Sequence, residues 1–341
     1  MADAWFAVLA LMLAGFTVFE GWTFGAGAIM PLVARTREER RAVVAAIGPL
    51  WSWREVWLVA TGGVLFAAFP AALATALAGY YLAVMMLLWC LLLRGIALEV
   101  GGHLDDTLWQ RFWDTVLWSA SLLLAVLFGA ALGNVIRGVP LGPDGRFLLP
   151  LFTDFRTAGQ VGLLDWYTLA VALFALVALG AHGAAYLVPR TDGAVRSRAA
   201  LLARRLWTTT AVLLPAISWL TTRVRPDFFA VLVARPLAIL ALVVVAAALA
   251  TVLVSLHRGR VETAVLASCA VLAGLLGGAA AALWPVMLRS TLDPAHDLTV
   301  AGAAAAPHGL ALAARWWPPA FLLAVGYAVW VSRRFARGPA G

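Results

Sequence analysis

The stretch FTVFEGWTFGAGAIMPLVARTREERR (residues 16–41) places a carboxylate deep in an apolar helix and follows it with a dense block of charge. The apolar run begins near Ala4, so at a rise of 1.5 Å per residue Glu20 lies about 24 Å along the helix axis. That depth is well inside a hydrocarbon core about 30 Å thick. Because an ionised carboxylate is costly there, we expect Glu20 to be paired, protonated or facing water inside a helix bundle.

The composition is that of a multi-pass membrane protein. Of the 341 residues, 63% are hydrophobic and 12% are charged, whereas soluble domains contain about 25% charged residues. The net charge of +8 does not indicate a nucleic-acid-binding protein, because apolar runs separate the charges and no large soluble domain is present. Cys90 and Cys269 lie inside apolar runs and are expected to be buried thiols. The first run has no basic region or cleavage site, so we expect a retained helix.

The spacing of apolar runs predicts an all-α polytopic membrane fold. A helix needs about 20 apolar residues to cross the hydrocarbon. Nine segments meet this length, and they are residues 4–30, 54–76, 79–98, 115–136, 162–188, 204–222, 228–255, 262–286 and 316–335. The two longer links, 137–161 and 287–315, are too short to be domains, so the whole chain, 1–341, is expected to be one integral membrane domain.

The distribution of arginine predicts the orientation. All 25 basic residues are arginine, and 17 of them lie in or beside the C-terminal tail and the links after the first, third, fifth and seventh segments. The positive-inside rule then places the C-terminus in the cytoplasm and the N-terminus outside a bacterial cell membrane. Both longer links would be extracytoplasmic.

Two further clusters carry polar side chains near segment ends. PLWSWREVWLVATGGVLFAAFP (residues 49–70) opens with Trp51 and Trp57 at interfacial depth, where indoles anchor a helix. Arg54 and Glu55 lie between them, and one interpretation is a single ion pair that snorkels to the surface. CLLLRGIALEVGGHLDDTLWQRFWD (residues 90–114) contains two more candidates.

These two candidates are Arg94 and Glu99. Arg94 lies near the end of an apolar stretch, where it can snorkel or donate to a quinone carbonyl or a phosphate headgroup. Haem ligation by this chain is not expected. His182 alone lies within a predicted span, and it has no partner at ligand-like spacing. Zinc-site spacing, phosphate loops and nucleophile–base pairs are also absent from the sequence, so we expect no metal and no catalytic residue here.

Six motifs in sequence order resemble subunit II of the cytochrome bd quinol oxidases. They are EGWTFGAG (20–27), GPLWSWREVWL (48–58), GGVLFAAFP (62–70), LLRGIALEV (92–100) with DDTLWQRFWD (105–114), GNVIRGVPL (133–141) and STLDPAHDLTV (290–300). In the first motif Gly21, Gly25 and Gly27 are candidates for close helix packing.

The resemblance implies two four-helix bundles plus one peripheral helix. The first bundle would span about 1–136, and the second bundle with the peripheral helix would span 162–341. It implies a heterodimer with subunit I, which carries the b-type and d-type haems and the quinol site of a respiratory oxidase. The haem-free subunit II would stabilise subunit I and contribute to a proton route from the cytoplasm. A structural quinone in this chain and a small single-helix accessory subunit are further expectations from some members.

The chain departs from the family pattern at two acids. Ser52 and Thr23 each stand where the family has aspartate, and a serine can relay a proton but cannot store one near neutral pH. We therefore hypothesise that Glu20 faces the bundle interior and pairs with Arg54, as a structural ion pair or as part of a rerouted proton path that includes Ser52 and Glu55.

Two functions of other classes stay open. A secondary transporter or ion channel would use Glu20 as its coupling carboxylate, although the two halves of the chain show no matching helix interruptions. A non-catalytic scaffold derived from the oxidase family is the other alternative.

Overall fold

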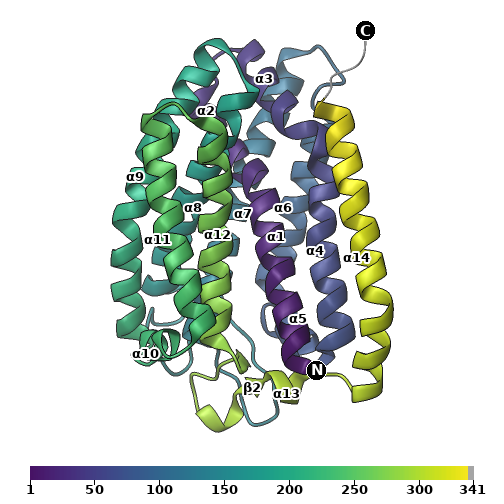
Figure 1. Cartoon of the computed structure of the whole chain (residues 1–341), viewed down its shortest axis with the longest axis vertical. Coiled ribbons are helices and arrows are strands. Elements are labelled where there is room, and N and C mark those ends of the chain that lie inside the picture. Colours follow the sequence, from purple (N-terminus) through teal and green to yellow (C-terminus); the bar gives the residue numbers. More distant parts are fainter. Residues whose placement is uncertain (337–341) are drawn as a thin grey trace.

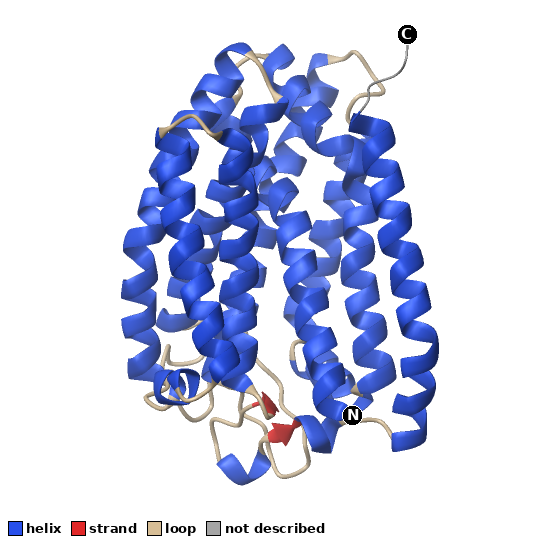
Figure 2. Ribbon diagram, in the orientation of Figure 1, coloured by secondary structure: helices blue, strands red, loops and turns tan. Residues whose placement is uncertain are grey.

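The computed structural model describes residues 1–336, apart from the side chains of Leu50, Ser52, Ala328 and residues 331–336. It is helical except for one small sheet (Figure 2). The helices are α1 Ala2–Ala28, α2 Met30–Val33, α3 Arg37–Ile47, α4 Trp51–Ala68, α5 Pro70–Gly79, α6 Tyr81–Val100, α7 Thr107–Arg137, α8 Trp166–Leu187, α9 Gly193–Val224, α10 Phe228–Val233, α11 Pro236–His257, α12 Val261–Leu283, α13 Val300–Ala303 and α14 Pro307–Ala336. Short 3-10 helices cover Gly48–Leu50, Val188–Arg190 and Pro294–His296.

The long helices run side by side along the longest axis of the molecule (Figure 1). Six of those described are long and apolar enough to cross a membrane, namely α1, α6, α7, α8, α11 and α12, and the bent pair of α4 and α5 would be a seventh. Helices α9 and α14 are as long, but arginines and interior prolines make them less apolar. The all-helical membrane fold predicted from the sequence is therefore confirmed, with six to seven candidate spans by length and composition.

Two of the predicted spans are broken by proline. The segment predicted as 54–76 is not one helix, because α4 ends at Ala68 and α5 turns away from it by 120°. Pro70 begins α5 and cannot donate the backbone hydrogen bond that would continue α4. The segment predicted as 228–255 is likewise divided, since α10 ends at Val233 and Pro236 begins α11.

The helices pack in two groups that meet at α1. Helices α8, α9, α11 and α12 contact one another, as do α1, α4, α6 and α7. Helix α14 packs on α4, at the right of Figure 1. Contacts of α1 with α8 and α12, and of α7 with α8, join the two groups. The centre of the molecule therefore lies around α1, the helix that carries Glu20.

Glycines allow α1 and α8 to cross in near backbone contact. A Cβ atom on Gly25 would overlap the carbonyl oxygen of Leu179, and one on Gly183 would overlap the backbone of α1. Gly21 also faces Leu179, and Gly27 faces the side chain of a serine on α7. Small residues allow membrane helices to come this close, so Gly21 and Gly25 lie where the two helix groups meet, and Gly27 lies between α1 and α7 within one group.

The links at the strand end of the molecule form a cap over the helices. Strands β1 (Val286–Leu288) and β2 (Leu298–Thr299) pair antiparallel, and Val139 forms a bridge with Ser290. Beneath them Arg137 forms a fully buried ion pair with Asp165, which also caps the first turn of α8. The opposite end carries α3, and we refer to the two ends as the strand end and the α3 end.

Candidate functional site

A buried polar cluster lies where α1, α4 and α6 meet. Glu20 and Thr23 come from α1, Glu55 from α4 and Arg94 from α6. Glu20 is eight residues and Arg94 six residues from the α3 end of its helix, which corresponds to depths of about 12 Å and about 9 Å. The cluster therefore lies inside the bundle, in the third of the molecule nearest the α3 end.

One guanidinium serves two carboxylates in this cluster. Arg94 Nη2 lies 2.9 Å from Glu20 Oε2 and 2.6 Å from Glu55 Oε1. Arg94 Nη1 donates to Thr23 Oγ1 over 2.8 Å, and that hydroxyl donates to Glu20 Oε2 over 2.5 Å. The guanidinium carbon also lies 4.8 Å from the centre of the Phe24 ring. The arrangement fixes both carboxylates around one cation.

The two carboxylates of the cluster differ in burial. The side chains of Glu20 and Arg94 are fully buried, while that of Glu55 is 24% exposed. With both carboxylates ionised, the cluster carries a net charge of −1. A second negative charge beside the first is unfavourable where water is absent. Glu20 Oε1 is buried and has no hydrogen-bond partner among the described residues.

The predicted pairing of Glu20 with Arg54 is wrong. Arg54 Nη2 donates to the hydroxyl of Tyr186 on α8 over 2.8 Å, and its guanidinium carbon lies 5.5 Å and 5.4 Å from the rings of Trp22 and Tyr186. Arg54 and Glu55 do not form the predicted snorkelling pair either. Consecutive residues on a helix point about 100° apart, so Glu55 faces α6 while Arg54 faces α8.

The snorkelling interpretation of Arg94 is also wrong, because the side chain is fully buried and its ion partners lie inside the bundle. Both of its Nη atoms are engaged within the chain, which leaves only Nε–H without a partner among the described residues. That engagement argues against Arg94 as the donor to a quinone carbonyl.

The remaining predicted residues divide between a surface pair and packing positions. Trp51 Nε1 donates to Glu99 Oε1 over 2.7 Å at an exposed position. Trp57 packs edge-on against Phe321 of α14, so it joins α14 to α4. Ser52 belongs to α4, and its side chain lies outside the described part of the chain.

Sequence reasoning missed the polar partners from α1 and α8. Thr23 was noted only as a missing aspartate, although its spacing of three residues from Glu20 places both on one helix face. Tyr186 carried no signal in the sequence.

His182 of α8 is fully buried. Its Nδ1 lies 2.7 Å from Ser268 Oγ, and its Nε2 lies 3.0 Å from the backbone oxygen of Val18 in α1. Both of its ring nitrogens are engaged, so its surroundings do not fit an axial haem ligand. Within residues 1–336 as described, no group of three His, Cys, Asp or Glu side chains is placed to hold a metal ion.

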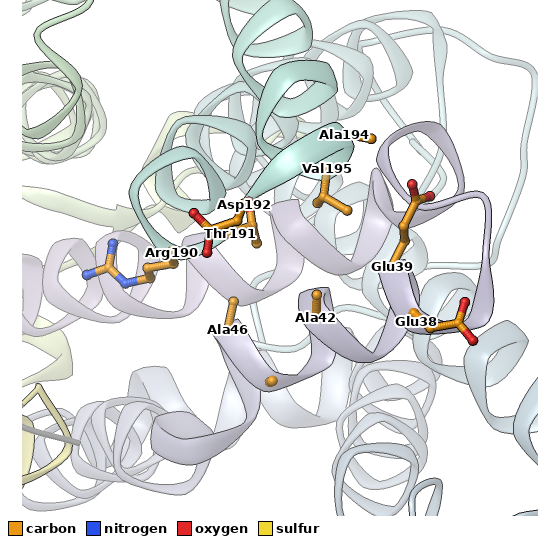
Figure 3. Close-up of a pocket in the computed structure, with 10 residues that line it drawn as sticks. Glu38, Glu39, Ala42, Ala46, Arg190, Thr191, Asp192, Ala194 and Val195 are labelled. Atoms are coloured by element: carbon orange, nitrogen blue, oxygen red, sulfur yellow. The ribbon is translucent and has the colours of Figure 1, made fainter. Parts of the chain in front are cut away.

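An open depression of about 460 Å³ lies at the α3 end, between α3 and the start of α9. Figure 3 shows Ala42 and Ala46 of α3 facing Thr191 and Val195 across it. Glu39 lies on its rim, where Oε1 accepts from Arg198 Nη2 over 2.6 Å. Hydrogen bonds from Arg198 and from the backbone before α3 lower the pKa of Glu39 to about 2. The ion pair of Glu39 with Arg198 ties α3 to α9.

Comparison with known proteins gives one consistent family. The family model described as cytochrome bd terminal oxidase subunit II matches residues 1–335. The chain is 30% identical over 310 residues to cytochrome bd ubiquinol oxidase subunit 2 of Bacillus subtilis, covering 90% of this chain and 88% of that protein. It is 30% identical over 194 residues to cytochrome bd-I ubiquinol oxidase subunit 2 of Escherichia coli K12, covering 57% of this chain and 50% of that one. The fold matches a chain of the bd oxidase from Geobacillus thermodenitrificans with a TM-score of 0.72 at 18% identity, over 99% of each chain.

Proposed function

The chain belongs to the cytochrome bd terminal oxidase subunit II family, and on that premise we propose that its Glu20–Arg94–Glu55 cluster holds a proton for the oxidase complex. As subunit 2 the chain is part of a ubiquinol oxidase, a membrane oxidoreductase of the bacterial respiratory chain, and its partner is subunit 1. The transporter or channel alternative is therefore set aside. The question that remains is what this subunit contributes to the complex.

The sharing of one guanidinium by two carboxylates is the observation that carries the proposal. Removing a proton from such a cluster leaves two negative charges against one positive charge in a water-poor site. Adding one proton makes the cluster neutral, so it can be loaded and unloaded with one proton. Glu55 is partly exposed and Glu20 is not, so Glu55 is the residue that exchanges the proton and Glu20 the residue that stores it. Thr23, bonded to both Glu20 and Arg94, keeps the carboxylate oriented.

The arrangement of this cluster in the membrane follows from the arginine distribution. The α3 end would face the cytoplasm, with the N-terminus outside, and the cluster would then lie about 10 Å below the cytoplasmic side. Nine spanning helices, grouped as two four-helix bundles with α14 at the periphery, are the topology that we propose. Helices α9 and α14 would span although their composition is less apolar, because both run the length of the bundle (Figure 1).

The haems and the quinol site belong to subunit 1 in this account. This chain would supply no catalytic residue of its own, and the b-type and d-type haems of subunit 1 would supply the electron transfer from quinol to oxygen. A structural quinone within this chain, if bound, would need donors other than the Nη atoms of Arg94, which are engaged with Glu20, Glu55 and Thr23. A small single-helix accessory subunit completes the proposed assembly.

Two neutral substitutions in the assembled complex test the proposal. Glu20→Gln and Glu55→Gln each keep the size of the side chain and remove the exchangeable proton. We expect both variants to assemble with haem-bearing subunit 1, as seen in a reduced-minus-oxidised visible spectrum, and to lose quinol oxidase turnover by about tenfold or more, a typical loss for a removed proton-transfer group. Wild-type turnover in both variants would contradict the proposal. A wild-type complex without oxidase activity would favour the non-catalytic scaffold.

A further inference from the structure

A second hollow at the α3 end lies between α3 and α7 and is lined by arginine. Its volume is about 210 Å³, which is the liquid volume of roughly seven water molecules. Gly101 and Gly102, just after α6, form part of its wall, so no side chain fills it from that side. A small charged group fits into this groove.

Three arginines of α3 line the groove. Arg40 and Arg41 come three and four residues after Arg37, which places both on the same face of the helix as Arg37. Two carboxylates hold them in position. Asp105 bonds to Arg37 and lies 2.7 Å from Arg41 Nη2, and Asp114 Oδ2 lies 2.9 Å from Arg40 Nε. These five groups leave the groove with a net charge of +1.

Several donors in the groove have no acceptor. Neither Nη atom of Arg40 bonds to a described residue, and the Nε1–H of Trp113 is buried without a partner among them. The arginines lower the pKa of Asp105, so this carboxylate stays charged and keeps its two guanidinium groups in place. Guanidinium and indole N–H groups in a positively charged groove can donate to an anion with several oxygen atoms. Phosphate is such an anion, and two of its oxygens can accept from the two parallel N–H groups of one arginine.

The surroundings of the groove indicate a lipid as the source of that phosphate. Leu108 and Phe112, in the first turns of α7, are 77% and 58% exposed. The ring of Trp109 packs edge-to-face against that of Trp113. Exposed apolar and aromatic side chains of this kind are typical of the headgroup level of a membrane. The depression in Figure 3 is lined by Glu38, Glu39 and Asp192 with one arginine, Arg190, so the two hollows of the α3 end differ in charge.

We propose that the groove between α3 and α7 binds the phosphate of an anionic phospholipid. Basic pockets between membrane helices are known to bind such headgroups. The phosphate would accept from Arg40, Arg41 and Trp113, and the acyl chains would lie along the exposed face of α7. A lipid held there would fix α3 against α7, directly above the end of the helix that carries Arg94.

The test uses the purified complex with subunit 1 in detergent. Its thermal unfolding is measured against added phosphatidylglycerol, phosphatidylcholine with the same acyl chains, and inorganic phosphate. Phosphatidylglycerol alone is expected to raise the melting temperature. In the double variant Arg40→Gln/Arg41→Gln, the same shift should need about 25-fold more phosphatidylglycerol, since each arginine near a charged membrane surface contributes about fivefold. Arg196→Gln, an exposed arginine of α9 outside the groove, is the matched control and should respond as the wild type does.

Each remaining outcome decides the proposal. An equal response of the double variant and the wild type, or an equal effect of phosphatidylcholine, overturns it. A shift produced by inorganic phosphate alone assigns a free-anion site and overturns the lipid. If the double variant does not assemble, Trp113→Phe removes one donor and keeps the ring, and it should weaken the phosphatidylglycerol effect several-fold. The readout in all groove variants is the shift in melting temperature and not oxidase turnover, which separates this test from that of the proton cluster.

Discussion

Replacing Arg94 by glutamine should destabilise the complex. The change removes two ion pairs, at 2.9 Å to Glu20 and 2.6 Å to Glu55, and the hydrogen bond to Thr23. Breaking a buried ion pair by removing one partner costs about 3–5 kcal/mol, because the other charge stays buried. Large domains lose about 2 °C in melting temperature per kcal/mol, so we expect a decrease of roughly 6–10 °C at pH 8.

Without Arg94, Glu20 and Glu55 are left facing each other without a cation. The assay is thermal unfolding of the assembled complex at pH 8, followed by loss of the haem spectrum. Arg94→Lys keeps the charge without the fork and should lie between Arg94→Gln and the wild type. A melting temperature for Arg94→Gln within 2 °C of the wild type would refute the reasoning.

Three further predictions follow from contacts elsewhere in the chain. Gly25→Ala should reduce assembly strongly because its Cβ overlaps the α8 backbone, whereas Gly63→Ala, in open space, should have no effect; both are read from the yield of complex. Tyr186→Phe should cost about 1.5–3 kcal/mol of stability in denaturant titration, since it removes the only hydrogen-bond acceptor that buried Arg54 has among the described residues. The pKa of Glu39 is lowered to about 2, so its stabilising contribution is complete above pH 4.5 and is lost as the pH falls toward 2. The difference in melting temperature between wild type and Glu39→Gln should therefore be constant from pH 7 to 5 and shrink below that; a constant difference down to pH 3 would contradict it.

The helical fold and the family could be predicted from the sequence because their signals are local. Apolar runs predict the approximate places of the long helices, and the family that the six motifs resemble is confirmed by a family model that covers residues 1–335. The helix breaks at Pro70 and Pro236 were missed because the apolar pattern continues across both prolines. A hydropathy pattern alone does not distinguish a straight span from a bent pair.

The burial of Glu20 could be predicted, but its partner could not. Depth along α1 depends on residue count alone, whereas the choice between Arg54 and Arg94 depends on how α4 and α6 are rotated about their axes. Arg54 is nearer to Glu20 in sequence than Arg94 is. It comes one helix position before Glu55, however, and so points about 100° away from it, toward Tyr186. The second carboxylate of the cluster, Glu55, is placed by the same rotation.

Infrared difference spectroscopy of the carboxyl groups tests the central claim most directly. The oxidase complex would be compared between its oxidised and quinol-reduced states at pH 7, for the wild type, Glu20→Gln, Glu55→Gln and the double variant. The account predicts one protonated-carboxyl signal in the wild type that responds to turnover and is absent from the double variant and from Glu20→Gln. A wild-type signal that persists unchanged when both glutamates are replaced would show that the cluster holds no exchangeable proton.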